Sequence, residues 1–327
     1  MPSINIFQDD AFSLASLTAA IQSVPYAPGR ISASNLFTDR PINTLDAYIE
    51  QENGVLELLP VVPRGAPAAR VDPAKRVAKS FRVPHVPAED LVTADQITGV
   101  RAFGSETEVE AVARVVANRF IPMRNSIEYT IESHRLLAIK GSFVDSVGAE
   151  RSLFTEFGVT QVVVSFALAT AATKVRAKCQ EVLEAVEDGL GGLSFSGVRV
   201  FCGKNFWSGL ISHDSVEKTY LNTQQAASLR GDTREAFEFG GLSWERYRGT
   251  SAVKIGDDEA FAVPEGVVDL FLSAMSPADY IETAGTMGQR IFAKQWETEG
   301  GKGVKLEAQA NMLNICTRPA AVVKLTK

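Results

Sequence analysis

The chain has 327 residues, of which 45% are hydrophobic and 22% charged, and its formal net charge is −6. This length favours two connected lobes over one compact core, and the negative charge argues against a protein that coats nucleic acid. No segment approaches the roughly 20 apolar residues that span a bilayer, and residues 1–10 do not resemble a signal peptide.

The N-terminal region predicts one short helix followed by a less regular segment. Residues 10–24 carry apolar side chains at helical spacing, and Pro25 and Pro28 would stop a helix there. The segment Tyr26–Pro41 is expected to be mostly extended. Together these features predict an N-terminal arm that contains an amphipathic helix.

The next region predicts a long β-hairpin. Thr44–Glu50 and Val55–Val62 resemble strands and are separated by the turn signal Asn53–Gly54. Residues 63–73 are rich in proline and small side chains, which is typical of an exposed loop. Residues 77–83 alternate as a strand does. The tip of such a hairpin has too few apolar side chains to pack on a core of its own.

The tip and the return strand of this hairpin are basic. One acid, Asp72, stands against six cations, which are Arg64, Arg70, Lys75, Arg76, Lys79 and Arg82. Two interpretations remain open. The segment is either a solvated loop or a projecting arm that lies on an acidic neighbour, in which case these six residues are interface candidates.

A very long helix is predicted from Ser105 to Gly141. Ser105 and Glu108 form a capping box, and Lys140–Gly141 is a typical helix end. One face carries an apolar stripe made of Val109, Val112, Val116, Phe120, Met123, Ile127 and Ile131. Pro122 removes a backbone hydrogen bond in the middle. Because the stripe continues in phase across it, a bend is expected rather than a break.

The second half of the chain alternates helical and strand-like segments. After a turn at residues 143–148, residues 154–166 are rich in β-branched and aromatic side chains. Helical patterns are expected at residues 171–188 and 204–229, and the two-glycine turn Gly240–Gly241 predicts a hairpin between residues 237–239 and 242–244. Further strands are expected at residues 198–201, 261–263, 267–272 and 321–325.

No catalytic, cofactor or metal site can be assembled from the sequence. His134 falls on the apolar face of the long helix, which indicates a core or interface residue, and His213–Asp214 lacks a nucleophile elbow nearby. Gly203–Lys204–Asn205 resembles a fragment of a phosphate-binding loop but lacks its spacing. The three cysteines are far apart and odd in number, so reduced thiols are expected.

Three places in the chain carry a resemblance to a known family. They are Val62–Gly65, then residues 97–104 continuing through residues 129–135 to Lys140–Gly141, and finally residues 277–283, 293–294, 311–313 and 318–319. In this order and spacing the chain resembles the lambda-type major capsid proteins of tailed phages, the phage capsid protein E family. These proteins are similar in fold to the Hong Kong 97-type (HK97-like) shell proteins.

The resemblance implies an α+β fold with five parts. Residues 1–41 would form the N-terminal arm, residues 42–86 the extended hairpin loop, and residues 87–170 a peripheral domain with the spine helix 105–141. Residues 171–265 would form the axial domain, and residues 266–327 would return to the peripheral domain. Pro122 is the candidate hinge at which the spine helix would change shape during maturation.

The resemblance also implies partners and a location. Subunits would form hexamers and pentamers of an icosahedral shell around double-stranded DNA, which is enclosed without sequence-specific binding. A portal, a separate scaffolding protein and an optional decoration protein would join them, with assembly in the host bacterial cytoplasm and the virion as destination. No cofactor and no enzymatic activity are expected.

Two alternatives stay open from the sequence. The first is an encapsulin-like nanocompartment shell, which uses a similar fold to enclose an enzyme, and its packaged cargo would distinguish it. The second is a soluble α/β enzyme whose site the sequence does not reveal. Such an enzyme would require a convergent polar pocket with a defined catalytic residue.

Overall fold

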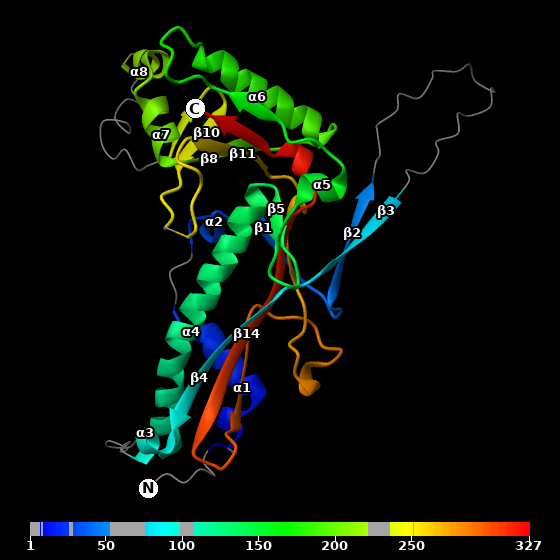
Figure 1. The fold of residues 1–327 in the computed structure, drawn as a ribbon, viewed down its shortest axis with the longest axis vertical. Helices are drawn as coiled ribbons and strands as arrows, with labels where there is room; N and C mark the ends of the chain where they lie inside the picture. The colour runs from blue at the N-terminus through cyan, green and yellow to red at the C-terminus, as the bar shows by residue number, and fades with distance from the viewer. Residues whose placement is uncertain are drawn as a thin grey trace, which may run out of the picture.

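The computed structural model describes residue 7 and residues 9–25, 29–52, 76–98, 108–221, 236–250 and 252–327. Two regions are visible in Figure 1, an elongated one around helix α4 and strand β14, and a compact one around a six-stranded sheet at the upper end. Within the described ranges no helix is both long and apolar enough to cross a membrane.

The elongated region pairs a long helix with a five-stranded sheet. Helix α4 (Glu108–Ile139) runs beside the 14-residue strand β14 (Gly303–Cys316) (Figure 1). Strand β14 pairs antiparallel with β4 (His85–Thr93), β13 (Phe292–Glu297) and β12 (Phe271–Met275), and β1 (Phe37–Pro41) extends the sheet in parallel with β12. The predicted apolar stripe is buried from Val112 to Ile131, which confirms the orientation of the helix.

Helix α4 continues through Pro122 without interruption. Proline at this position removes one backbone hydrogen bond, but the flanking turns remain helical because their apolar side chains are packed. The helix ends at Ile139, and Gly141 follows with a φ of +82°. The predicted capping residue Ser105 lies outside the described residues, and the side chain of Glu108 is not described.

The N-terminal segment covers the free edge of the sheet. After the short helix η2 (Asp10–Phe12), helix α1 (Leu14–Ser23) lies along edge strand β13. The Thr18 hydroxyl accepts a hydrogen bond from the backbone N–H of Ala293 at 3.1 Å and lies 3.3 Å from the Ala293 carbonyl. Such cover prevents an edge strand from pairing with another chain. The predicted N-terminal helix is confirmed.

The segment after this helix differs from the prediction. A one-turn helix, α2 (Arg30–Ala33), precedes β1 where a mostly extended chain was expected. Its N-terminal N–H groups are paired with a carboxylate of α4, a partner about 100 residues away in the sequence. Local sequence patterns therefore carried no signal for this turn.

The predicted hairpin leaves the body at an angle (Figure 1). Strands β2 (Asp46–Glu52) and β3 (Arg76–Arg82) pair antiparallel, from Asp46 opposite Arg82 to Glu52 opposite Arg76. The predicted strand 55–62 and the loop 63–73 lie outside the described residues. At the root, Ile49 and Phe81 are buried in a cluster with Phe143 and Phe157. The root of the hairpin therefore packs on its own chain.

A small connecting unit supports this root. It consists of the two-stranded ribbon of β5 (Ser142–Val144) and β6 (Glu150–Ser152) and the following helix α5 (Leu153–Phe157). Residues 154–166 therefore begin as a helix and reach a strand only at β7 (Val163–Ser165).

The compact region is a six-stranded sheet in the order β7, β15, β11, β8, β10, β9. The added strands are β15 (Val323–Thr326), β11 (Glu259–Glu265), β8 (Gly197–Cys202), β10 (Leu242–Arg246) and β9 (Phe237–Phe239). The same region contains helices α6 (Val175–Leu190), α7 (Lys204–Ile211) and α8 (Asp214–Leu221). Val175, Cys179, Val182 and Val186 are fully buried, as the predicted stripe of α6 required.

Two predictions in the last third needed correction. The strand expected at residues 267–272 begins only at Phe271, because Gly266 (φ +76°) and Asp269 (φ +55°) form a turn before it. In the last third, β13 and the full length of β14 were not predicted, and neither was β4 (His85–Thr93) in the first third. Strand β14 is buried almost continuously from Val304 to Cys316 and contains Gln309, Asn311 and Asn314, so it lacks the alternation that marks a half-exposed strand. The hairpin of β9 and β10 around Gly240–Gly241 is confirmed.

Candidate functional site: the inner charged row and the assembly surfaces

A row of buried charged residues runs along α4 beside its apolar stripe. These residues, the inner charged row, are each at most 8% exposed and comprise Arg124, Glu128, Glu132 and Arg135. Their spacing of four, four and three residues places them on one face of the helix. Buried charges are costly unless they are paired and hydrogen-bonded, so each member requires a partner.

Arg124 and Glu128 hold two segments that are distant in the sequence. Arg124 Nη1 donates to the carbonyls of Ile21 (2.6 Å) and Gln22 in the last turn of α1, where helix carbonyls lack partners. Glu128 accepts from Nε (2.9 Å) and Nη2 (2.7 Å) of Arg290, which precedes β13. This two-pronged pairing is the strongest geometry that an arginine and a carboxylate can adopt.

Glu132 pairs with the first N–H groups of helix α2. Its carboxylate accepts from the backbone N–H of Ile31 (2.8 Å), from the N–H of Ser32 (3.1 Å) and from the Ser32 hydroxyl (2.8 Å). The hydroxyl of Tyr247, the residue directly after β10, donates to it at 3.4 Å. A Cβ on Gly29 would lie 2.1 Å from Glu132 Cδ, so the close approach depends on this glycine.

Arg135 connects the helix to strand β1. Its Nη2 donates to Asp39 Oδ1 at 2.9 Å and to the Ser273 hydroxyl at 3.1 Å, and its Nε donates to Asn314 Oδ1 at 3.4 Å. The guanidinium also lies 5.0 Å from the centre of the Phe37 ring. Burial lowers the pKa of Arg135, so the nearby carboxylate of Asp39 is needed to stabilise its charge.

The inner charged row therefore connects one helix to the N-terminal segment 21–39 and to Tyr247, Ser273, Arg290 and Asn314 in the second half of the chain. Residues 129–135 contributed to the family resemblance in the sequence, but this role was not predicted. Charges at helical spacing beside an apolar stripe are also found on the exposed flank of an ordinary amphipathic helix, so the sequence carried no clear signal of their burial.

A second polar network lies on strand β14. Gln309 Nε2 donates to Asp279 Oδ1 at 2.7 Å, and Asn311 Nδ2 donates to the Pro277 carbonyl at 2.9 Å. The Tyr280 hydroxyl donates to Glu307 Oε1 at 3.1 Å, and burial raises the pKa of Tyr280. These contacts hold residues 277–280 on β14 and place the motif residues 277–283 next to residues 311–313.

The structure places only part of the predicted basic hairpin. Arg64, Arg70 and Lys75 lie outside the described residues, and Arg76 begins β3 without a described side chain. The Lys79 ammonium donates to the Glu156 carbonyl of its own chain and lies 5.2 Å from the centre of the Phe157 ring. Arg82 lies 3.6 Å from Asp46 on the paired strand. The contact of these six basic residues with a neighbouring subunit stays a prediction.

Two of the three histidines have hydrogen-bond partners within the fold. His213 is buried, and its ring nitrogens lie 2.8 Å from the Ser215 hydroxyl and 3.2 Å from the Thr170 carbonyl. His85 Nδ1 lies 2.8 Å from Asn311 Oδ1. His134 is partly buried, and burial lowers its pKa. Among the described residues no group of three or more potential ligands could hold a metal ion.

The glycine that resembled a phosphate loop has a packing role. Gly203 precedes α7, and the N–H groups of Asn205 and Phe206 both donate to the Asp257 carbonyl at 2.8 and 2.9 Å. A Cβ on Gly203 would lie 2.0 Å from the Gly256 carbonyl oxygen. The start of α7 is therefore occupied by the chain itself and offers no room for a phosphate.

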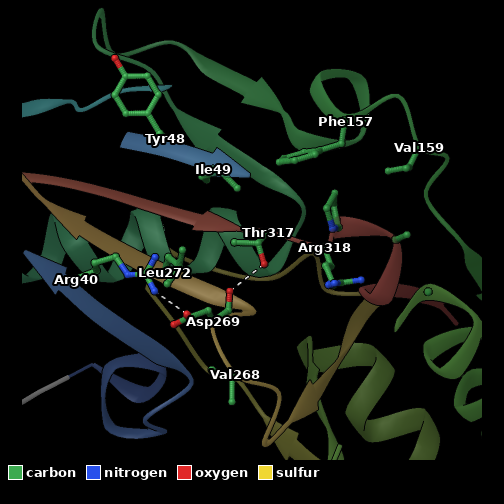
Figure 2. A pocket seen from close by; sticks show the side chains of 13 residues that line it. Arg40, Tyr48, Ile49, Phe157, Val159, Val268, Asp269, Leu272, Thr317 and Arg318 are labelled. Atoms are coloured by element: carbon green, nitrogen blue, oxygen red, sulfur yellow. Dashed lines mark hydrogen bonds and ion pairs between the residues drawn. The ribbon is translucent and has the colours of Figure 1, made fainter. Parts of the chain in front are cut away.

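A concavity lies where the hairpin leaves the body (Figure 2). It has a volume of about 580 Å³ and is here called the corner cavity. It is lined by strand β2, by the turn before β12, by Phe157 and Val159, and by residues 317–320 around the short helix η4 (Pro319–Ala321). The residues converging on it include no pair of acid and base arranged for catalysis.

Comparison with known proteins gives a consistent result. The sequence pattern of the family described as phage major capsid protein E matches residues 13–327. The major capsid protein of Salmonella phage Felix O1 is 26% identical over 350 residues, with 95% of each chain covered. The major capsid protein of Pseudomonas phage KPP10 is also 26% identical, with 96% of each chain covered.

Solved structures show the same fold. A protein assigned as the capsid protein of a prophage in Escherichia coli CFT073 has a TM-score of 0.58 at 13% identity, with 96% of this chain and 98% of that chain covered. At this identity the likeness concerns the fold alone. The arrangement of helix α4, the hairpin and the two sheets is therefore an HK97-like α+β capsid fold, as the sequence predicted.

Proposed function

Because the chain belongs to the phage major capsid protein E family, and is thus the major capsid protein of a tailed phage or prophage, we propose that its subunits form hexamers and pentamers of an icosahedral shell around double-stranded DNA. The observation that carries the proposal is the hairpin of β2 and β3, whose strands leave the body (Figure 1). Of its six basic residues, Arg64, Arg70, Lys75 and Arg76 would contact a neighbouring subunit, whereas Lys79 and Arg82 contact their own chain at the root.

The parts of the fold would take different places in the shell. The six-stranded region, with residues 171–265, would surround the centre of each capsomer as the axial domain. The elongated region around α4 would be the peripheral domain, completed by residues 266–327. Residues 1–41 would be an arm packed mainly on its own subunit, because α1 and α2 contact α4 in the described residues.

The shell would require further partners. We expect a portal, a separate scaffolding protein and an optional decoration protein, with assembly in the host cytoplasm before the virion is complete. The net charge of −6 supports enclosure of DNA without strong or sequence-specific binding, because phosphate binding depends mainly on lysine and arginine. As a structural protein of the virion, the chain is expected to have no catalytic activity.

Charge reversal in the hairpin tests the proposed contact. We expect Arg64→Glu combined with Arg70→Glu and Lys75→Glu to lower shell yield strongly and to remove its dependence on salt, because exposed ion pairs are screened over about 8–10 Å at ordinary salt. Lys79 is left unchanged since it contacts Glu156 within the subunit. Sedimentation of assembled and free protein between low and high salt gives the measurement.

The control for this experiment is Lys218→Glu on α8, whose side chain is 74% exposed and lies in a different region. The melting temperature of each free subunit shows whether folding is intact. If the triple variant forms shells with the yield and salt dependence of the wild type, the hairpin does not make the proposed contact.

Pro122 is proposed as a hinge of α4. Replacing it with alanine restores a backbone hydrogen bond and favours a straight helix, since proline costs about 3 kcal/mol in a helix interior. We expect Pro122→Ala shells to assemble but to expand more slowly than the wild type. The angle between the two halves of α4, compared in immature and mature shells, gives the measurement, and an unchanged angle would rule the hinge out.

A further inference from the structure

The contacts within the subunit do not explain the role of the corner cavity. It lies between strand β2, which carries Tyr48 and Ile49, and the turn that presents Val268 and Asp269 (Figure 2). Its volume of about 580 Å³ is in the range that holds several side chains of a partner. Its position, between hairpin and body, is the inner corner of the arm.

One wall of the corner cavity is a turn held in place by its own chain. Arg40 Nη2 donates to Asp269 Oδ2 at 2.6 Å, and the Thr317 hydroxyl donates to the Asp269 carbonyl at 2.9 Å (Figure 2). Asp269 has a φ of +55°, a conformation that aspartate tolerates better than most residues. The result is a fixed turn whose tip, Val268, is 87% exposed.

The opposite wall, strand β2, contributes a buried side chain to the floor. Ile49 is 6% exposed and belongs to the floor with Phe157 and Leu272, whereas Tyr48 is 66% exposed and points away from Ile49 on the other face of the strand (Figure 2). Val268 remains in water at the rim of the concavity. A partner that covers it would bury area that the isolated subunit leaves exposed.

A cation at the floor of the corner cavity lacks an acidic partner. Arg318 is partly buried, and among the described residues its guanidinium forms no ion pair, whereas the nearby Arg40 is paired with Asp269. A partly desolvated guanidinium gains most from an incoming carboxylate. The chain has 39 acidic against 33 basic residues, so another copy has carboxylates to supply.

We propose that the corner cavity binds the neighbouring copy of this chain, which covers Val268 at the rim and places a carboxylate against Arg318. The inference rests on the proposed function because it assumes that the subunits form a ring. In a ring of identical subunits, each contact joins two different surfaces of the subunit. The neighbour that lies under an arm would therefore also lie against the inner corner of that arm. The corner cavity would then complete the contact that the hairpin begins.

Thiol labelling at Val268 tests this directly. The native Cys179, Cys202 and Cys316 are buried, and burial raises the pKa of each thiol, so a maleimide should not modify them in the folded chain. We expect Val268→Cys to be labelled rapidly in free subunits and at least about tenfold more slowly in assembled shells. Dissociated shells in urea should be labelled completely. Equal labelling rates in shells and free subunits would overturn the inference.

Charge reversal at Arg318 provides the second test. We expect Arg318→Glu to lower shell yield about tenfold or more, and Arg318→Lys to retain part of it, because a lysine keeps the charge but not the paired geometry. Lys218→Glu is the matched control, and the melting temperature of each free subunit reports folding. If Arg318→Glu does not fold, labelling at Val268→Cys decides.

The two experiments separate this inference from the proposed function. Wild-type protein that never forms shells contradicts the proposed assembly itself. Wild-type shells together with full yield from Arg318→Glu contradict only the role of the corner cavity. Protection of Val268→Cys together with loss of yield from Arg318→Glu supports both.

Discussion

Replacing Glu132 with alanine is expected to lower the free energy of unfolding of the subunit by about 3 kcal/mol. The carboxylate accepts two backbone N–H groups and one hydroxyl from α2 in a buried setting, and alanine would leave all three donors without a partner. Water cannot easily replace it, because Glu132 is only 5% exposed. The N-terminal segment should then detach from α4 more often.

Urea unfolding of free subunits measures the free energy, and limited proteolysis measures the release of residues 1–41. The matched control is Glu187→Ala on the exposed face of α6, for which a change within about 0.5 kcal/mol is expected. If Glu132→Ala and Glu187→Ala have the same stability and the same proteolysis rate, Glu132 does not hold the N-terminal segment.

Replacing Arg290 with alanine is also expected to lower the free energy of unfolding of the subunit by about 3 kcal/mol. The substitution leaves the Glu128 carboxylate at 8% exposure without the guanidinium that contacts both its oxygens. Removal of Arg290 is costly because the buried Glu128 carboxylate then keeps only the longer ion pair with Arg124 at 4.0 Å among those described. Adding Glu128→Gln to Arg290→Ala should therefore recover part of the lost stability.

A double-mutant cycle of these two positions gives the measurement, with free energies from urea unfolding. Lys294→Ala serves as the control, because its partner Glu282 is 54% exposed and exposed pairs contribute less than about 1 kcal/mol. Strictly additive effects of Arg290→Ala and Glu128→Gln would show that the two side chains do not interact in solution.

Features set by local periodicity could be predicted from the sequence. The apolar stripe of α4 and that of α6 repeat every three or four residues, so both helices and their buried faces were correct. The turn at Gly240–Gly241 was also correct, since both glycines adopt positive φ angles there. In these places the residues that determine the local structure are close together in the sequence.

Features set by distant partners could not be predicted. Glu132 contacts a residue 101 positions away, and Glu128 contacts one 162 positions away. The sequence neighbours of these two glutamates therefore do not show why a carboxylate is buried there. Helix α2 exists because Glu132 pairs with its first N–H groups. Strand β14 is recognised as a strand only when its neighbours β4, β12 and β13 are known, because both of its faces are covered.

The predicted interface residues of the hairpin stay a prediction. Lys79 and Arg82 lie on the root of the hairpin, where both contact their own chain. Arg318, which the sequence indicated only as part of a short motif, proves to line the corner cavity. Its significance depends on the turn at Asp269 and the strand at Tyr48, two segments that lie far from each other along the chain.

Electron cryomicroscopy of the protein expressed with its genomic neighbours is the most direct measurement of the proposed assembly. We predict closed icosahedral shells of hexamers and pentamers, in which each hairpin lies over an adjacent subunit while the inner charged row stays within one subunit. A persistent monomer or small oligomer under all conditions, or shells in which the hairpin folds back on its own subunit, would contradict it.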